Sequence, residues 1–174
     1  MRKALLTALL GTAIATPVVD RAHAQTAAPP PAPATLNQLM RGTLYPESNI
    51  VFASQDVNPA DIPRAKDPNM ATDLLTTVFG KWDAVENSAL AIAEVANLLE
   101  LPGRKCSNGL DVPLKNPDWA KFVQELRDAG MVAYAAAKTK DQDKMTDAAG
   151  VLTNACAHCH FKYREKRNPA DRCK

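Results

Sequence analysis

Residues 141–164 read DQDKMTDAAGVLTNACAHCHFKYR, and the architecture of the chain can be worked out from this stretch. Its apolar residues recur at spacings of three and four, namely Met145, Ala149, Leu152, Cys156, Cys159 and Tyr163. Residues at these spacings lie on one face of an α-helix. The pattern therefore predicts an amphipathic helix that ends before Pro169 and packs its apolar face against other helices.

Three other segments repeat this periodicity, with almost no alternation typical of strands. They run from Thr35 to Pro46, from about Asn69 to Leu101, and from Asn116 to about Thr139. The boundaries carry helix-terminal signals, such as a capping box at Thr35 and a proline in the first turn after Asn116. Residues 46–68 hold four prolines and are expected to form an irregular crossover. Four amphipathic segments predict an all-α fold, an antiparallel four-helix bundle spanning residues 35–174.

The N-terminus has the layout of a secretory signal. Arg2 and Lys3 precede a short apolar run, and Ala22-His23-Ala24 supplies the small residues at a cleavage site. Residues 1–24 are therefore expected to be a signal peptide, the alternative being an N-terminal helix docked on the body. Residues 25–34, QTAAPPPAPA, are expected to form an extended Pro/Ala-rich tether. Export of a bacterial chain with this signal places the mature protein in the periplasm, where cysteines tend to be oxidised or covalently modified.

Charge and hydropathy exclude two classes of protein. The 174-residue chain has a formal net charge of +2, without the strong basic surplus that is typical of a nucleic-acid binder. No apolar run approaches the roughly 20 residues that a membrane-spanning helix needs. The sequence predicts a protein that neither spans a membrane nor binds nucleic acid.

One motif in the predicted C-terminal helix contains the residues that point to a chemical function. Cys156, Cys159 and His160 form C-x-x-C-H, the attachment pattern of c-type haem. Two thiols three residues apart face the same way on a helix and can each join one haem vinyl group, and the adjacent imidazole can bind the iron. The motif therefore predicts one covalently bound haem c, with Cys156 and Cys159 as thioether anchors and His160 as the proximal ligand.

Three other interpretations of the motif remain open. A C-x-x-C redox dithiol is usually found in an α/β context, which the helical pattern lacks. A structural zinc site would recruit Cys156, Cys159, His160 and Cys173. The motif could also be a chance match formed by two buried free thiols.

The motif and its position together resemble a known family. C-x-x-C-H-x-x-Tyr-Arg at residues 156–164, on the last helix of an exported all-helical chain, is similar to class II cytochromes c, the cytochrome c prime group. The resemblance covers Thr35 to about Arg167 and is specific only at residues 156–164. It implies a haem buried between the helices near one end of the bundle. Because relatives often dimerise through their first helices, it also implies a homodimer. The short first helix and the second cysteine pair depart from the family's pattern.

The residue on the other face of the iron determines the chemistry. In the resembled family this residue comes from the first helix, and methionine there marks the members that transfer electrons. Met40 is the methionine in that helix and is the candidate distal ligand, although methionine also serves as a core filler. Met70 is a weaker alternative, and Met131 and Met145 are expected to pack in the core.

Other candidate haem contacts flank these ligands. Arg41 adjoins Met40 and suits a haem propionate, although a solvated arginine fits equally well. Tyr163 is expected to pack beside the haem with its hydroxyl bound to a polar partner. His158 is expected to face solvent. Lys162 and Arg164 follow the motif and could face the haem propionates or an acidic partner, although an ordinary charged helix face is the favoured interpretation.

The remaining cysteines, Cys106 and Cys173, are expected to form a disulfide bond. In an up-down-up-down bundle, the start of the third helix and the end of the fourth lie at the same end. The bridge would close a loop of 67 residues and hold the C-terminus in place.

These expectations combine into a function. The sequence predicts a periplasmic monohaem c-type cytochrome that exchanges single electrons with redox partner proteins by Fe(II)/Fe(III) cycling. It shows no Ser-His-Asp pattern and no phosphate-binding loop, so we expect no enzymatic activity and assign no catalytic residue. A high-spin protein that binds NO or CO at an open distal site is the alternative, and a helical interaction or zinc-stapled module without haem is a third reading.

Overall fold

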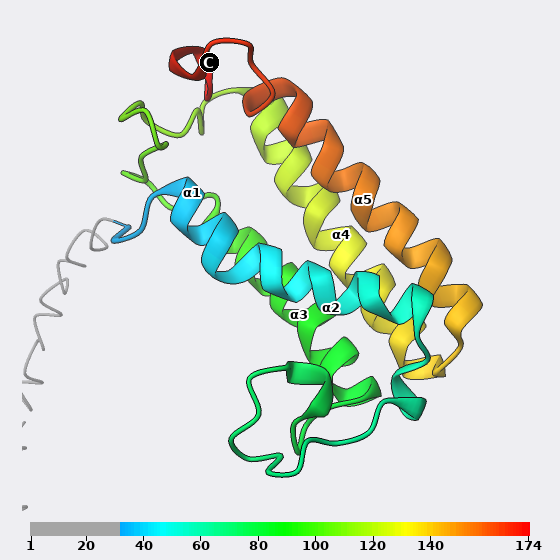
Figure 1. The fold of residues 1–174 in the computed structure, drawn as a ribbon. Coiled ribbons are helices and arrows are strands. Elements are labelled where there is room, and N and C mark those ends of the chain that lie inside the picture. The colour runs from blue at the N-terminus through cyan, green and yellow to red at the C-terminus, as the bar shows by residue number, and fades with distance from the viewer. Residues whose placement is uncertain (1–31) are drawn as a thin grey trace, which may run out of the picture.

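The structure, a computed structural model, describes residues 32–174. The predicted signal peptide and most of the predicted tether lie outside the described residues. Within residues 32–174 the chain is helical and contains no β-strand, only an isolated bridge between Lys105 and Asp111. The all-α prediction is therefore confirmed for this part of the chain (Figure 1).

The helical elements follow one another along the chain with two longer connections, residues 57–81 and 99–116. The main elements are α1 (Leu36–Leu39), the π-helical turn η1 (Met40–Leu44), α2 (Tyr45–Asp56), α3 (Trp82–Leu98), α4 (Pro117–Thr139) and α5 (Gln142–Tyr163). Three short 3₁₀ turns accompany them: η2 (Pro59–Asp61), η3 (Leu74–Thr76) and η4 (Pro169–Asp171).

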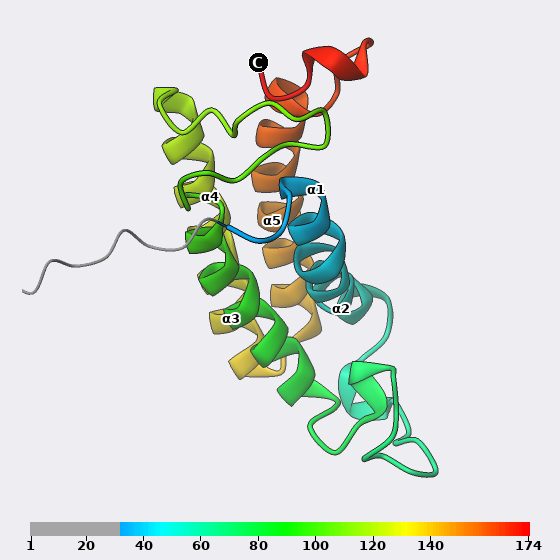
Figure 2. The same ribbon diagram turned by 90° about the vertical axis from the view of Figure 1, so that its left-hand side faces the viewer.

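The long helices pack as a bundle in which each contacts two neighbours. α3 packs against α2 and α4, and α5 packs against the same two helices. Figures 1 and 2 show α1, η1 and α2 as one continuous helical segment, with the chain reversing direction from each long helix to the next. α1, the end of α3, the start of α4 and the end of α5 therefore lie at one end of the bundle, and we call it the α1 end. None of the helices in residues 32–174 combines the length and apolar character that a membrane span requires.

The first helical segment is longer than the sequence predicts, because Pro46 does not end it. The π-helical turn η1 stands directly before this proline, and the Tyr45 N–H donates to the Met40 carbonyl five residues earlier. Proline in a regular helix lacks a donor and collides with the carbonyl four residues back. A widened turn just before it relieves that conflict, and the helix continues to Asp56.

The π turn also changes which side chains share a face. Leu39 and Leu44 are five residues apart, a spacing that puts them about 140° apart around a regular α-helix. Both are nevertheless buried, each with 8% of its surface exposed. A π turn closes after about five residues, so it brings both leucines to the core side of the segment.

The second predicted helix begins at Trp82 rather than near Asn69, so its first third was wrongly predicted. Residues 69–81 instead fold back through η3, and the Lys81 N–H donates to the Leu75 carbonyl at 2.9 Å. A Cβ at Gly80 would overlap that carbonyl, so the close approach requires glycine. Lys81 itself has a φ of 62°, which prevents the helix from extending backwards.

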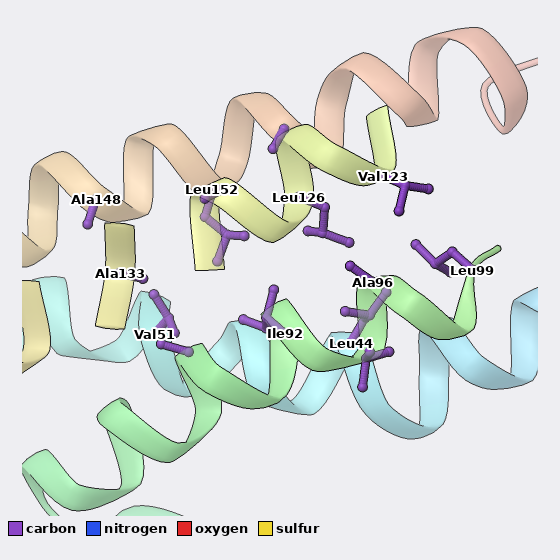
Figure 3. Close-up of a cluster of buried hydrophobic side chains, with 14 of the residues drawn as sticks. Leu44, Val51, Ile92, Ala96, Leu99, Val123, Leu126, Ala133, Ala148 and Leu152 are labelled. Carbon is purple, nitrogen blue, oxygen red and sulfur yellow. The ribbon is translucent and has the colours of Figure 1, made fainter. Parts of the chain in front are cut away.

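The core runs along the axis between the helices. Leu152 of α5, Ile92 of α3 and Val51 of α2 are fully buried and point toward one another (Figure 3). α3 and α4 approach closely at Gly130, where an added Cβ would lie 2.9 Å from the Ala93 backbone nitrogen. Small residues at this crossing therefore set the distance between the two helices.

A tight hairpin of two residues connects α4 and α5. Lys140 takes the left-handed conformation, with a φ of 55°, and ends α4. The Asp141 carboxylate then accepts hydrogen bonds from the backbone N–H groups of Asp143 and Lys144 and begins α5. This short turn fixes the register of α5, which carries the C-x-x-C-H motif.

Candidate cofactor-binding site

A cavity of about 1070 Å³ opens between the α1–η1–α2 segment and α5, with further walls from α3 and α4. This is at the upper end of the range in which small-molecule and cofactor sites fall. Its walls carry aliphatic and aromatic side chains, including Leu44, Phe52, Ile92, Trp119, Phe122 and Leu126. Six of the candidate ligand and contact residues from the sequence also line it, namely Met40, Arg41, Cys156, Cys159, His160 and Arg164.

The C-x-x-C-H motif forms the α5 wall of this cavity. Cys156 and Cys159 are free thiols that are partly buried against the core. Their spacing, with His160 four residues after Cys156, places all three on one side of the helix. The three functional groups can therefore reach a single ligand in the cavity.

Met40 and Arg41 stand on the facing segment, in the π turn η1. Met40 is half-buried and packs against the core, whereas the Arg41 side chain is exposed. Met40 also lines a small adjoining pocket of about 90 Å³ together with Cys159 and His160. The thioether and the imidazole thus share both cavities although 120 residues separate them in sequence.

Of the methionines in residues 32–174, the other three do not line the cavity. Met70, the weaker alternative ligand, lies before α3 with 77% of its surface exposed, and the structure does not bring it to the cavity. Met131 is 46% exposed on α4, so the expectation that it packs in the core is wrong. Met145 is fully buried, in agreement with a packing role.

Burial keeps both motif thiols protonated. It raises the pKa of the Cys156 thiol, and it raises the pKa of Cys159 to about 12, with smaller contributions from Cys156, Asp118 and Glu125. Redox dithiols of the C-x-x-C type depend on a lowered thiol pKa. The environment of these thiols is therefore unlike that of a redox dithiol.

His160 is held in its neutral form. Burial, and secondarily the nearby Arg164 guanidinium, lower the pKa of the imidazole from its ordinary value. Its Nδ1 atom lies 3.1 Å from Nη1 of Arg164. A neutral imidazole keeps a lone pair available, which is the state that binds a metal ion.

Tyr163 fastens the end of α5 to the start of α4. Its buried hydroxyl donates to the Asp118 carboxylate and accepts from Nδ2 of Asn116 at 3.3 Å. Asn116 is the N-cap residue of α4, but its side chain makes no capping hydrogen bond and binds Tyr163 instead. The Tyr163 ring meets Trp119 edge-on with centroids 5.1 Å apart and lines the small pocket behind His160. Tyr163 therefore supports the wall that carries His160.

Electrostatics around Tyr163 reflect this buried contact. The hydrogen bond from Tyr163 is the main cause that lowers the pKa of Asp118, with help from Lys162, whose Nζ lies 3.6 Å from the carboxylate. Desolvation, and then the same carboxylate, raise the pKa of Tyr163 to about 12. Outside the cavity, His158 is exposed and its Nδ1 lies 3.0 Å from the Glu125 carboxylate.

Cys106 and Cys173 meet at the α1 end of the bundle. Their sulfur atoms lie 1.95 Å apart, at disulfide distance. Cys173 is therefore not available as the fourth ligand of the zinc site considered from the sequence. Across residues 32–174, no three His, Cys, Asp or Glu side chains are arranged to hold a metal ion by themselves.

The structure also places residues at the cavity that sequence reasoning missed. Glu165 and Arg172 lie beyond α5 and line the cavity near its α1 end, beside Arg164, which the sequence had already singled out. Arg172 lies beyond the predicted helix, where no periodic pattern indicates the path of the chain. Only the closure of the Cys106–Cys173 loop, which could be expected from the sequence, hinted that this segment returns to the bundle.

Comparison with known proteins gives no match for this chain among family models, curated proteins or solved structures.

Proposed function

We propose that this protein is an exported monohaem c-type cytochrome that carries single electrons between redox partner proteins of the periplasm. One observation carries the proposal: a single large cavity is lined by Cys156, Cys159 and His160 on one helix and by Met40 on the facing segment. When bound, haem supplies a centre that cycles between Fe(II) and Fe(III). The residues of this chain attach the haem, bind its iron and exclude water from it.

The residues present fit a haem attached through α5. Cys156 and Cys159 are the thioether anchors, and their spacing and protonated state suit addition of S–H groups to two vinyl groups. His160, neutral and half-buried, is the proximal iron ligand. Covalent anchoring on α5 explains why the motif stands on a rigid helix that is capped at its start and fastened at its end.

Met40 is the proposed distal ligand. It is the methionine that shares the cavity with His160, and a thioether sulfur raises the reduction potential of haem iron. The apolar walls exclude water and lower the local dielectric, which further favours the less charged Fe(II) state. These features suit electron transfer more than ligand exchange.

The proposed fold is an antiparallel four-helix bundle that encloses the haem near its α1 end, as in the class II cytochromes c that the motif resembles. The location of the cavity and the ring of helix contacts support it. An oxidising periplasm suits the close approach of Cys106 and Cys173. A homodimer through the first helical segment and the absence of enzymatic activity remain parts of the proposal.

Mass and visible spectra of the exported protein test the proposal. After co-expression with maturation machinery, the intact mature chain should be heavier than its amino acids by one haem, and it should stay so after denaturation. A chain with no added mass would refute the proposal.

The distal ligand is tested by Met40→Ala. The wild type should give a low-spin spectrum that CO does not alter, and Met40→Ala should become high-spin and bind CO with the haem still attached. Met131→Ala, which removes an exposed methionine away from the cavity, is the matched control and should stay low-spin. A wild-type spectrum that is high-spin and shifts with CO would instead identify a protein that binds NO or CO at an open distal site.

A further inference from the structure

The segment after α5 returns to the cavity instead of leaving the bundle. We define residues 165–174 as the C-terminal strap, which includes the 3₁₀ turn η4 and Cys173. We propose that this strap places the Arg172 guanidinium in the cavity wall as the binding group for a carboxylate of the bound cofactor, which for haem is a propionate. The inference rests on the proposed function and goes beyond it by assigning a residue to the carboxylate end of the ligand.

The Arg172 side chain carries an unsatisfied donor at the cavity. Its Nε atom is buried and has no hydrogen-bond partner, and it is the one such side-chain atom among the described residues. Burying a donor without a partner costs about 1–3 kcal/mol. Arg172 lines both the large cavity and the small pocket behind His160, so an acceptor within the cavity would satisfy it.

The strap is fixed on both sides of Arg172. Cys173 is joined to Cys106, and its N–H donates to the Tyr163 carbonyl at 2.9 Å. Nδ2 of Asn108 donates to the Arg172 carbonyl at 2.9 Å and lies 3.3 Å from the Pro169 carbonyl. The backbone on either side is therefore anchored, whereas the Nε of the side chain is left without a partner.

The charge of the cavity lining favours an anionic group. Three guanidinium groups, those of Arg41, Arg164 and Arg172, line the cavity, and Glu165 is the acidic residue among the lining side chains. Arg41 comes from η1, so cationic groups approach from two facing segments. A carboxylate has a geometry that matches Nε and Nη of one guanidinium, which can donate two parallel hydrogen bonds to it.

The reduction potential of the haem-loaded protein tests the assignment. Arg172→Gln removes a positive charge beside the cofactor, so Fe(III) is less destabilised and the potential should shift downward. Arg172→Lys keeps the charge and should retain most of the wild-type potential. Arg167→Gln removes an exposed arginine of the same strap, outside the cavity lining, and should leave the potential unchanged.

A second measurement separates anchoring from charge. In a Cys106→Ser/Cys173→Ser background the strap loses its covalent anchor, so Arg172→Gln should shift the potential by much less than it does in the wild type. Thermal unfolding of the haem-loaded variants should show the same coupling, because the carboxylate contact is part of the folded state.

Outcomes for the two proposals differ. If every variant carries covalent haem and Arg172→Gln has the wild-type potential, Arg172 does not bind the carboxylate and the inference fails while the proposed function stands. If Arg172→Gln shifts the potential equally with and without Cys106 and Cys173, the strap does not position the side chain. A chain whose mass shows no haem contradicts the proposed function itself.

Discussion

The crossing of α3 and α4 at Gly130 allows a stability prediction with its own control. Gly130→Ala and Gly150→Ala introduce the same methyl group in the interiors of two long helices. Each gains about 1 kcal/mol of helix propensity. The added Cβ at Gly130 would lie 2.9 Å from the Ala93 nitrogen and 3.0 Å from the Ala89 carbonyl oxygen, whereas at Gly150 nothing lies within 4 Å.

The propensity gains cancel in the comparison, so the difference between the variants reports the crowding alone. Overfilling a packed site costs about 1–3 kcal/mol, and Gly130→Ala should be less stable than Gly150→Ala by that amount. With a urea slope of about 2 kcal/mol per molar, the unfolding midpoints should differ by about 0.5–1.5 M. Urea unfolding of the two variants, followed by circular dichroism, measures this difference. Equal midpoints would show that the helices are not held at the distance described here.

Three other measurements address the disulfide, Tyr163 and the motif thiols. Replacing Cys106 and Cys173 by serine opens a 67-residue loop and should lower the free energy of unfolding by about 4 kcal/mol, measured in urea; an unchanged value would mean that the bond does not form. Tyr163→Phe removes the main cause of the lowered pKa of Asp118. A lowered carboxyl pKa stabilises the fold above the unfolded value of about 4, so the variant should be less stable at neutral pH and should approach the wild type as the pH falls below 4; a pH-independent difference would contradict this. In haem-free folded protein, Cys159, with a pKa of about 12, should react with iodoacetamide at pH 8 roughly tenfold or more slowly than in urea, as followed by mass spectrometry; equal rates would refute its burial.

Sequence periodicity predicted most of the bundle, and it failed where the backbone departs from regular helix. Pro46 was read as a helix end because its effect on a regular α-helix is well defined, whereas the π turn that accommodates it has no clear sequence signature. The segment before Trp82 has apolar residues at helical spacing, yet the close backbone contact at Gly80 depends on tertiary packing. Periodicity shows which side of a helical segment is apolar. It does not show where the backbone leaves the regular helix, and both errors are of that kind.

The candidate site followed from the sequence wherever a local motif defined it. Cys156, Cys159 and His160 are fixed by their spacing on one helix, so their presence on one wall could be anticipated. Met40 depended on an analogy of position, and the structure places it at the same cavity. Arg172 could not be found in this way, because its location depends on a non-local contact with the loop that carries Cys106 and Asn108.

Because of the π turn at Met40–Leu44, the first helical segment is sensitive to the deletion of a residue. Deleting one residue there would close the turn to a regular helix, in which Pro46 again lacks a donor and meets the carbonyl four residues back. It would also rotate residues 45–56 by about 100° relative to α1 and move Val51 away from α3 and α5. Most substitutions leave the number of residues unchanged and would keep residues 45–56 in the same orientation relative to α1. A deletion of one residue would change that orientation. The number of residues in this turn therefore matters for the fold. With this number, Met40 lines the cavity while Val51 of α2 lies in the core.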